Sequence, residues 1–380
     1  MQKKVTTLED GVRYEGEKEV DQIPEDERKE KRAFLKEFVK GKTLYAKATE
    51  STTQVLKEIR EGKNINVGKV EEIVASMVDS ILENADTMLT LAKIKEYDEY
   101  TFKHSLNVAV LTIALAKYLH FSKRELQIIG TGGIMHDCGK MKVPPEILNK
   151  PGKLTEWEFS NMKKHPEAGA KLLEETGGFD RRAILMVLQH HEKYAGGGYP
   201  NSVPGNKIST FGMMTAIADV YDALTSERVY KKGMPPFNAL KILYRDRGYH
   251  FHPKLVEHFI RAMGLYPVGS LVRLGNNCIG IVINANRVNL LHPKIMVITD
   301  GENNPLPQPR IININPPTSD VSAEWTISDI MEPEKTSQKK EKDRSDIEIV
   351  EVLDPAVLNI SVEKYLTEAA SLEKEEEDAA

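Results

Sequence analysis

The spacing of apolar residues predicts helices in the first quarter of the chain. Residues 17–32 are almost entirely charged, and helix-forming residues dominate from Phe34 to Arg60. The sequence EGKNIN at 61–66 interrupts this pattern, and apolar residues then recur at three- and four-residue steps from about Val70 to Tyr97. This spacing predicts one long amphipathic helix whose apolar stripe packs into a core, with a dimer seam as the alternative use of the same stripe.

The pattern changes twice along the rest of the chain. From Tyr100 to about Met263 helical patterns alternate with short polar loops. The segment GLYPVGS at 264–270 ends this alternation. Short β-branched runs separated by Gly and Asn follow at 271–274, 279–283 and 294–298. They predict a module of three or four β-strands, the fourth at Ile311-Ile312. The polar, charged stretch at 332–346 is typical of a disordered linker, and it precedes a weakly apolar segment and an acidic end.

These borders divide the chain into four parts and predict a mainly α-helical protein. The parts are an N-terminal helical region at 1–98 that could serve regulation or dimerisation, a helical domain at 99–265, a small β module at 266–317, and a polar linker with an acidic tail, largely disordered, at 318–380. We therefore expect a helical bundle extended by a small C-terminal sheet.

Composition and charge exclude several classes of protein. The chain has 380 residues, of which 40% are hydrophobic and 29% charged, and its net charge of -5 gives no general attraction to nucleic-acid backbones. The two cysteines, Cys138 and Cys278, make no disulfide framework. No run reaches the roughly 18–20 apolar residues of a membrane-spanning helix, and the first residues lack the apolar core of a secretory signal. We expect a cytoplasmic protein with no membrane span and no nucleic-acid partner.

Seven potential metal ligands stand between positions 104 and 219. They are His104, His136, Asp137, His165, His190, His191 and Asp219. Five of the ten histidines of the chain belong to this set. Imidazole and carboxylate without thiolate suit Fe, Mn or Zn held for catalysis. Seven ligands are too many for one ion but sufficient for two if one carboxylate bridges them, so the set predicts a metal-dependent hydrolase.

Two ligand pairs are adjacent in sequence, and this spacing favours two ions. Neighbouring residues of a helix point about 100° apart, so His136 and Asp137 cannot easily chelate one ion side by side. They can address two neighbouring ions if the two oxygens of Asp137 bridge them, and His190-His191 repeats this logic. Two metals roughly 3.5–4 Å apart suit phosphoester hydrolysis, because they activate a bridging hydroxide and neutralise the phosphate under attack.

The ligands lie in segments that resemble the HD-GYP family of the HD phosphohydrolase superfamily. The matching segments are YTFKHSLNVAVLTIALA (100–116), GIMHDCGKMKVPPEILNKPGKLT (133–155), MKKHPEAGAKLL (162–173), LQHHEKYAGGGYP (188–200) and IADVYDALTSERVYKKG (217–233). The resemblance implies an all-helical HD-type bundle, and a phosphodiesterase that hydrolyses a cyclic dinucleotide, cyclic di-GMP above all, at two or three divalent metals.

The resemblance also implies a role for each site residue. One metal would be held by His104, His136, Asp137 and Asp219, and the other by Asp137, His165, His190 and His191. Fe or Mn would be the ion, Asp137 would take part in catalysis, and Lys140 would reach the scissile phosphate. Arg228 and Lys231 would grip the phosphates, and Tyr199 would offer a ring and a hydroxyl to the substrate. The Gly-rich loop that ends in Tyr199 and Pro200 serves in the family as a surface for protein partners.

Two positions depart from the family pattern. Three-metal members carry a Glu four residues before the first ligand His, where this chain has Tyr100 beside Glu99. Tyr is a poor ligand for a hard divalent ion unless it is deprotonated, so we expect two metals. Ala195 replaces the Asp of the family's HHExxDGxGYP segment. A carboxylate there could orient ligand histidines, and its loss could weaken metal binding or activity.

The leading hypothesis is a bacterial signalling enzyme that opens cyclic di-GMP to pGpG and, if the linear product is retained, cleaves it to GMP. A catalytically weak or inactive sensor of cyclic dinucleotides, or a partner-docking module, is the alternative that Ala195 supports. A phosphodiesterase for another cyclic dinucleotide, such as cyclic GMP-AMP, is the third, because the residues that read the bases cannot be located from the sequence.

Overall fold

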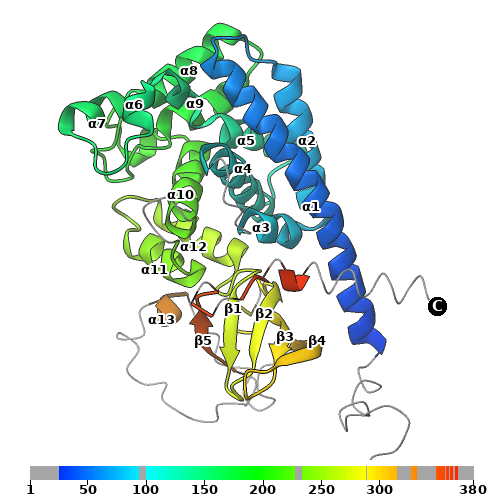
Figure 1. Cartoon of the computed structure of the whole chain (residues 1–380). Coiled ribbons are helices and arrows are strands. Elements are labelled where there is room, and N and C mark those ends of the chain that lie inside the picture. The colour runs from blue at the N-terminus through cyan, green and yellow to red at the C-terminus, as the bar shows by residue number, and fades with distance from the viewer. Residues whose placement is uncertain are drawn as a thin grey trace, which may run out of the picture.

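The computed structural model describes residues 25–93, 100–226, 233–287, 289–314 and 327–331, and residues 348–366 apart from 356, 359 and 363. Its helices are α1 Glu25–Arg60, α2 Val67–Glu83, α3 Ala85–Lys93, α4 Tyr100–Tyr118, α5 Lys123–Met135, η2 Cys138–Lys142, α6 Pro145–Leu148, α7 Glu156–Met162, α8 His165–Thr176, α9 Arg181–Gln189, η3 Gly205–Lys207, α10 Thr210–Thr225, α11 Pro236–Arg245, α12 Pro253–Met263 and α13 Ile327–Met331. Its strands are β1 Leu271–Leu274, β2 Ile279–Asn284, β3 Lys294–Thr299, β4 Pro305–Asn313 and β5 Ile349–Leu353. Figure 1 shows a helical body above a small sheet, with α1 running along one side past α2 and α3.

The single helix predicted from Val70 to Tyr97 is broken at Asn84, so this expectation was wrong in its extent. Asn84 has an extended backbone (φ −146°, ψ 101°) and its N–H donates to the carbonyl of Ser80 at 2.8 Å. Its side-chain oxygen accepts the N–H of Asp86 at 3.0 Å, which caps the start of α3. The apolar spacing continues across this turn, and for that reason periodicity alone did not reveal the break. Residues 94–97 lie outside the described ranges.

The apolar stripe of α2 belongs to the core of the same chain. Its buried residues are Val70, Ile73, Val74, Met77, Val78 and Ile81. They pack where α2 contacts α1 and α5. One apolar core runs from Phe38 in α1 through Leu106 in α4 to Met296 in the sheet. The helices on the two sides of the predicted domain border at 98/99 therefore share one core. A dimer through the N-terminal helices would have to use a face other than the buried stripe of α2.

The β module is a five-stranded antiparallel sheet in the order β4-β3-β2-β1-β5. The four predicted strands are present, but β5 comes from the segment that we assigned to the largely disordered tail. Val272 of β1 pairs with Val352 of β5, and Leu353 is buried. β5 (IVEVL) is apolar at four of its five positions, but it is a single short run after a long polar stretch, and the sequence does not show which strand it pairs with. The short helix α13 lies in the same predicted tail.

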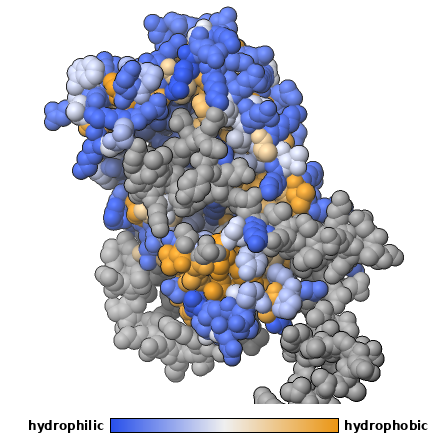
Figure 2. Space-filling model, in the orientation of Figure 1, coloured by the Kyte–Doolittle hydropathy of each residue, from blue (hydrophilic) through white to orange (hydrophobic). Residues whose placement is uncertain are grey.

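The predicted fold class, mainly helical with a small C-terminal sheet, is confirmed. Among the helices within the described ranges, none is both long and apolar enough to cross a membrane. Figure 2 shows a largely hydrophilic surface over the helical body and apolar surface near the junction with the sheet. The ligand-bearing helices α4, α5, α8, α9 and α10 lie in the helical body (Figure 1).

Candidate metal centre

Close helix packing places the first ligands side by side. Helix α5 begins in a capping box, in which Ser122 and Glu125 bond each other's backbone N–H. Near its end a Cβ on Gly133 would lie 2.6 Å from the Cα of Ala109, so glycine is needed for α5 to approach α4 this closely. His104 on α4 and His136 at the end of α5 therefore meet edge to face, with ring centroids 5.2 Å apart.

Three ligand histidines are oriented by the backbone of a preceding helix end. In each, Nδ1 lies 2.8 Å from the carbonyl oxygen three residues earlier; the pairs are His136 with Gly133, His165 with Met162, and His190 with Val187. A carbonyl oxygen only accepts, so each Nδ1 carries the proton and each Nε2 presents a lone pair. This tautomer and orientation suit metal ligation through Nε2.

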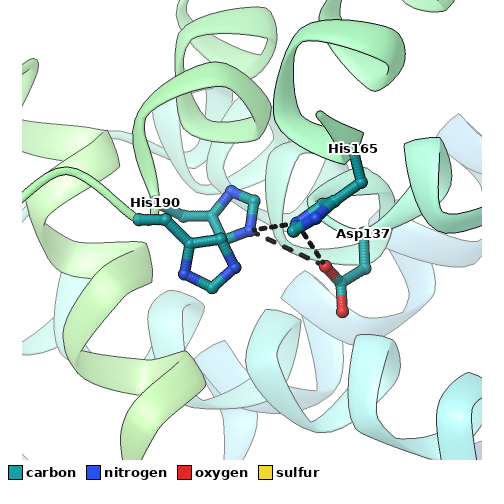
Figure 3. A group of neighbouring side chains, drawn as sticks. Asp137, His165 and His190 are labelled. Carbon is teal, nitrogen blue, oxygen red and sulfur yellow. Dashed lines mark hydrogen bonds and ion pairs between the residues drawn. The ribbon is translucent and has the colours of Figure 1, made fainter. Parts of the chain in front are cut away.

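The Asp137 carboxylate joins two sets of histidines. Its Oδ1 lies 3.2 Å from Nε2 of His165 and 3.6 Å from Nε2 of His190, as Figure 3 shows. Its Oδ2 lies 3.4 Å from Nε2 of His136 and 3.7 Å from Nε2 of His104. Each oxygen therefore faces a different set, as a bridging carboxylate requires.

All seven predicted ligands converge in two neighbouring groups. The groups are Asp137, His165, His190 and His191, and His104, His136 and Asp219, with the ligand atoms of each group within 4.8 Å of one another. Nε2 of His136 and Oδ1 of Asp137 are buried without a hydrogen-bond partner among the described residues. Buried polar atoms are costly when unpaired, so these two atoms indicate a missing ligand. The donor set of imidazoles and carboxylates fits two divalent ions.

Mutual attraction keeps the carboxylates of the centre ionised. Burial would raise the pKa of Asp137, but the Lys140 ammonium and His136 outweigh it and hold that pKa well below its usual range. Asp219 is likewise buried, and its hydrogen bond and charge interaction with His104 lower its pKa. Burial alone would lower the pKa of His104, yet hydrogen bonds to Asp219 and Asp222 raise it to about 10. The centre therefore presents ionised carboxylates, which are ligands suited to divalent cations.

Two of the predicted substrate contacts lie beside the ligands. Nζ of Lys140 is 2.5 Å from Oδ2 of Asp137, on a side chain that remains 23% exposed. The ring of Tyr199 stacks on His191 with centroids 4.6 Å apart, and burial raises the pKa of its phenol. Arg228 and Lys231 lie outside the described residues. Tyr100 is the first residue of α4, and Glu99 falls in the gap before it.

The carboxylate that shapes the Gly-rich loop is Glu192, which the sequence reasoning did not single out. Glu192 is 4% exposed and accepts the N–H of Asn201 at 2.7 Å and of Val203 at 3.2 Å. Ala195, in contrast, is exposed, and its backbone N–H bonds the carbonyl of Tyr249. The position of Ala195 gives no support to the hypothesis that a carboxylate lost there would orient the buried ligands.

The carboxylate that supports a ligand histidine is Asp222, which contacts the ring nitrogen of His104 that is turned away from the other ligands. The sequence reasoning also missed this residue. Asp222 is 3% exposed and its Oδ2 lies 2.7 Å from Nδ1 of His104. A signal was present, because Asp222 follows Asp219 by three residues and shares its side of the helix. A partner of this kind fixes the orientation of the ligand ring.

Comparison with known proteins agrees with this geometry. The HD domain family matches residues 70–255. A cyclic di-GMP phosphodiesterase of Pseudomonas aeruginosa is 36% identical over 277 residues, which are 73% of this chain and 67% of that protein. The chain belongs to the HD-GYP group of the HD domain family.

Two further relatives match this HD-GYP chain over only part of their own length. The cyclic di-GMP phosphodiesterase response regulator RpfG of Xanthomonas campestris is 34% identical over 60% of this chain and 61% of its own length. The 3'3'-cGAMP-specific phosphodiesterase 2 of Vibrio cholerae is 33% identical over 59% of this chain and 44% of its own. The HD-GYP chain thus spans less than two thirds of either protein. Helix α1 lies outside the 70–255 match.

Proposed function

We propose that this protein hydrolyses cyclic di-GMP to pGpG, and to GMP where the linear product is retained, with two divalent ions. The observation that carries the proposal is the Asp137 carboxylate, whose two oxygens face two separate groups of histidines. The Pseudomonas and Xanthomonas relatives, both named cyclic di-GMP phosphodiesterases, support the choice of substrate. The test is incubation with cyclic di-GMP in Mn and in anaerobic Fe, followed by chromatography; absence of pGpG and GMP in both would refute the proposal.

The protein's own groups would orient the substrate at this centre. Two bound divalent ions would neutralise the phosphate and activate a water for in-line attack. Lys140, partly exposed beside Asp137, offers a fixed positive charge to a phosphate oxygen. Tyr199 keeps its phenolic proton because burial raises its pKa, so it can donate a hydrogen bond to the substrate. Four histidine rings surround the Asp137 carboxylate, and this packing limits the side-chain motion of the ligands. The site is therefore preorganised.

A second candidate substrate is cyclic GMP-AMP, favoured by the similarity to the Vibrio cholerae phosphodiesterase specific for it. Both substrates have the same phosphodiester ring, so the metal centre described above does not distinguish them. Parallel measurements of kcat/KM on the two dinucleotides decide between these substrates. A non-catalytic sensor remains the other class, and it would bind cyclic di-GMP without forming product.

We expect two metal ions per chain, Fe or Mn, since the seven ligands form two groups and Tyr100 stands where a third metal would need an acid. Anaerobic purification followed by elemental analysis should give about two ions per chain, and anomalous scattering should place them on either side of Asp137. Three ions per chain, one of them at Tyr100 or Glu99, would contradict this expectation.

Arg228→Ala should weaken cyclic di-GMP binding and leave the metal content unchanged. We propose Arg228 and Lys231 as grips for the substrate phosphates, and loss of one charge-assisted contact costs roughly 1.5–3 kcal/mol, or about a ten- to hundredfold weaker Kd. Calorimetry with the metal-loaded protein measures this. Arg310→Ala, which removes an exposed arginine on β4, is the matched control. Equal affinity of Arg228→Ala and the control would exclude the proposed grip.

We also propose a cellular setting and partners for this activity. Both cysteines are free, and Cys138 is buried, which suits the expected reducing cytoplasm of a bacterial signalling protein. The surface of the loop at 196–200 remains our proposed contact for protein partners. A homodimer would use an exposed face of the N-terminal helices, where Val39 is 48% and Leu82 is 40% exposed.

A further inference from the structure

A hydrogen-bonded chain leads from the ligand His104 to helix α1. Its first link is Asp222 on α10, whose Oδ2 lies 2.7 Å from Nδ1 of His104. A carboxylate oxygen accepts, so Nδ1 of His104 donates to it, and Nε2 is turned toward Asp219 at 3.1 Å. Asp222 therefore determines which nitrogen of His104 faces the metal centre.

The second link is Asn107, one helical turn after His104 on α4. Its Nδ2 donates to Oδ1 of Asp222 at 2.9 Å, and Asn107 is 6% exposed. Ser226 donates to the same oxygen at 3.1 Å. The amide nitrogen of Asn107 is thus committed to Asp222, and its oxygen must face a donor on the opposite side.

That donor is the hydroxyl of Tyr45 on α1, which donates to Oδ1 of Asn107. The direction of every proton in the chain follows: Tyr45 donates to Asn107, Asn107 donates to Asp222, and His104 donates to Asp222. The three bonds join residues separated by 62, 115 and 118 positions. Such a network holds only when the packing of α1 on α4 is in place.

We propose that Tyr45 is a positioning residue for the metal centre, acting through Asn107 and Asp222 on His104. Through this chain of bonds, helix α1 affects the metal affinity of the group formed by His104, His136 and Asp219 more than that of the group formed by Asp137, His165, His190 and His191, which the three bonds do not reach. A displacement of α1 would loosen one metal of the pair without touching a ligand. The inference rests on the metal centre of the proposed function.

The test is Mn²⁺ binding to the full-length protein, followed by electron paramagnetic resonance and calorimetry without substrate. Tyr45→Phe keeps the ring and removes only the hydroxyl, so α1 retains its packing surface. We expect one of two Mn²⁺ sites to weaken roughly three- to tenfold, because one neutral hydrogen bond is lost at a distance from the ligand. Asp222→Asn should weaken the same site by about 10–100-fold, because it acts on the ligand directly.

Tyr221→Phe is the matched control, since the Tyr221 hydroxyl is buried on α10 beside Asp222 and has no hydrogen-bond partner in the part of the chain that the structure describes. It should leave both Mn²⁺ sites unchanged. The double variant Tyr45→Phe/Asp222→Asn separates positioning from mere packing: if Tyr45 acts through Asp222, it should bind Mn²⁺ no more weakly than Asp222→Asn alone.

Each outcome bears on the inference. Wild-type affinity at both sites in Tyr45→Phe, or additive losses in the double variant, overturns the role of Tyr45 and leaves the proposed function intact. A wild type that binds no Mn²⁺ overturns the metal centre and this inference together. Thermal unfolding of the metal-free variants shows whether they are folded, and a selective loss at one site in a folded Tyr45→Phe supports the inference.

Discussion

Asp137→Ala should abolish hydrolysis of cyclic di-GMP and remove both metals. The two oxygens of Asp137 lie 3.2–3.7 Å from the Nε2 atoms of four histidines, so its loss removes the carboxylate that faces both groups. Metal ions contribute several kcal/mol to the stabilisation of a phosphoryl transition state, and we expect kcat to fall by about a thousandfold or more. Elemental analysis and product chromatography on the same preparation measure both effects.

The control for this prediction is Asp79→Ala. Asp79 is also a carboxylate on a helix, but its side chain is 60% exposed and pairs with Lys123. Exposed ion pairs contribute little, so this variant should keep its metals and its turnover. Turnover near the wild-type rate in Asp137→Ala would refute the bridging role of this residue.

Gly139→Ala should lower stability and disturb the metal centre although Gly139 is not a ligand. A Cβ at this position would lie 1.9 Å from the carbonyl oxygen of His165 and 2.5 Å from the N–H nitrogen of Gly169. Both neighbours are backbone atoms of α8, so the clash can be relieved only by moving α8 away from η2. Because α8 begins with His165, the shift would pull this ligand away from Asp137.

We expect Gly139→Ala to lose about 1–3 kcal/mol of unfolding free energy or more, and most of its metal. Denaturant unfolding in a chelator gives the first quantity and elemental analysis the second. Gly68→Ala in α2 is the control, because its Cβ would meet nothing closer than Oδ1 of Asn66 at 3.6 Å. Alanine favours a helix by up to about 1 kcal/mol over glycine, so this control should be neutral or more stable. Equal stability of the two variants would show that α8 moves without cost.

The ligand set could be predicted because each ligand lies in a local motif. His136-Asp137 and His190-His191 are adjacent, and the Nδ1 of His136, His165 and His190 is fixed by a carbonyl only three residues earlier. These features depend on helix ends, which the local sequence encodes. Strands β1 to β4 could be predicted for the same reason, since their β-branched runs are separated by Gly and Asn.

Predictions from the sequence were wrong where one local pattern is compatible with two different structures. The apolar steps from Val70 onward fit one helix as well as two, and only the caps made by Asn84 decide. Strand β5 (IVEVL) is apolar at four of its five positions, but it follows the polar stretch at 332–346 and was taken as part of the tail. Its place in the sheet depends on pairing with β1, where Arg273 contacts Glu351 across 78 positions. Ala195 appeared to be the loss of a supporting carboxylate, yet the structure places that support at Asp222.

The sequence by itself indicated which residues could bind metal and showed that the chain is mainly helical with a small sheet; the number of ions stays a prediction. The tertiary structure decided how the ligands are supported: Asp222 behind His104, Tyr45 behind Asn107, and Gly139 against α8. The physical reason is distance along the chain. A helix end or an apolar stripe is a property of neighbouring residues. A hydrogen bond across 118 positions, or an approach of η2 to α8 so close that Gly139 has no room for a Cβ, exists only after the helices have packed.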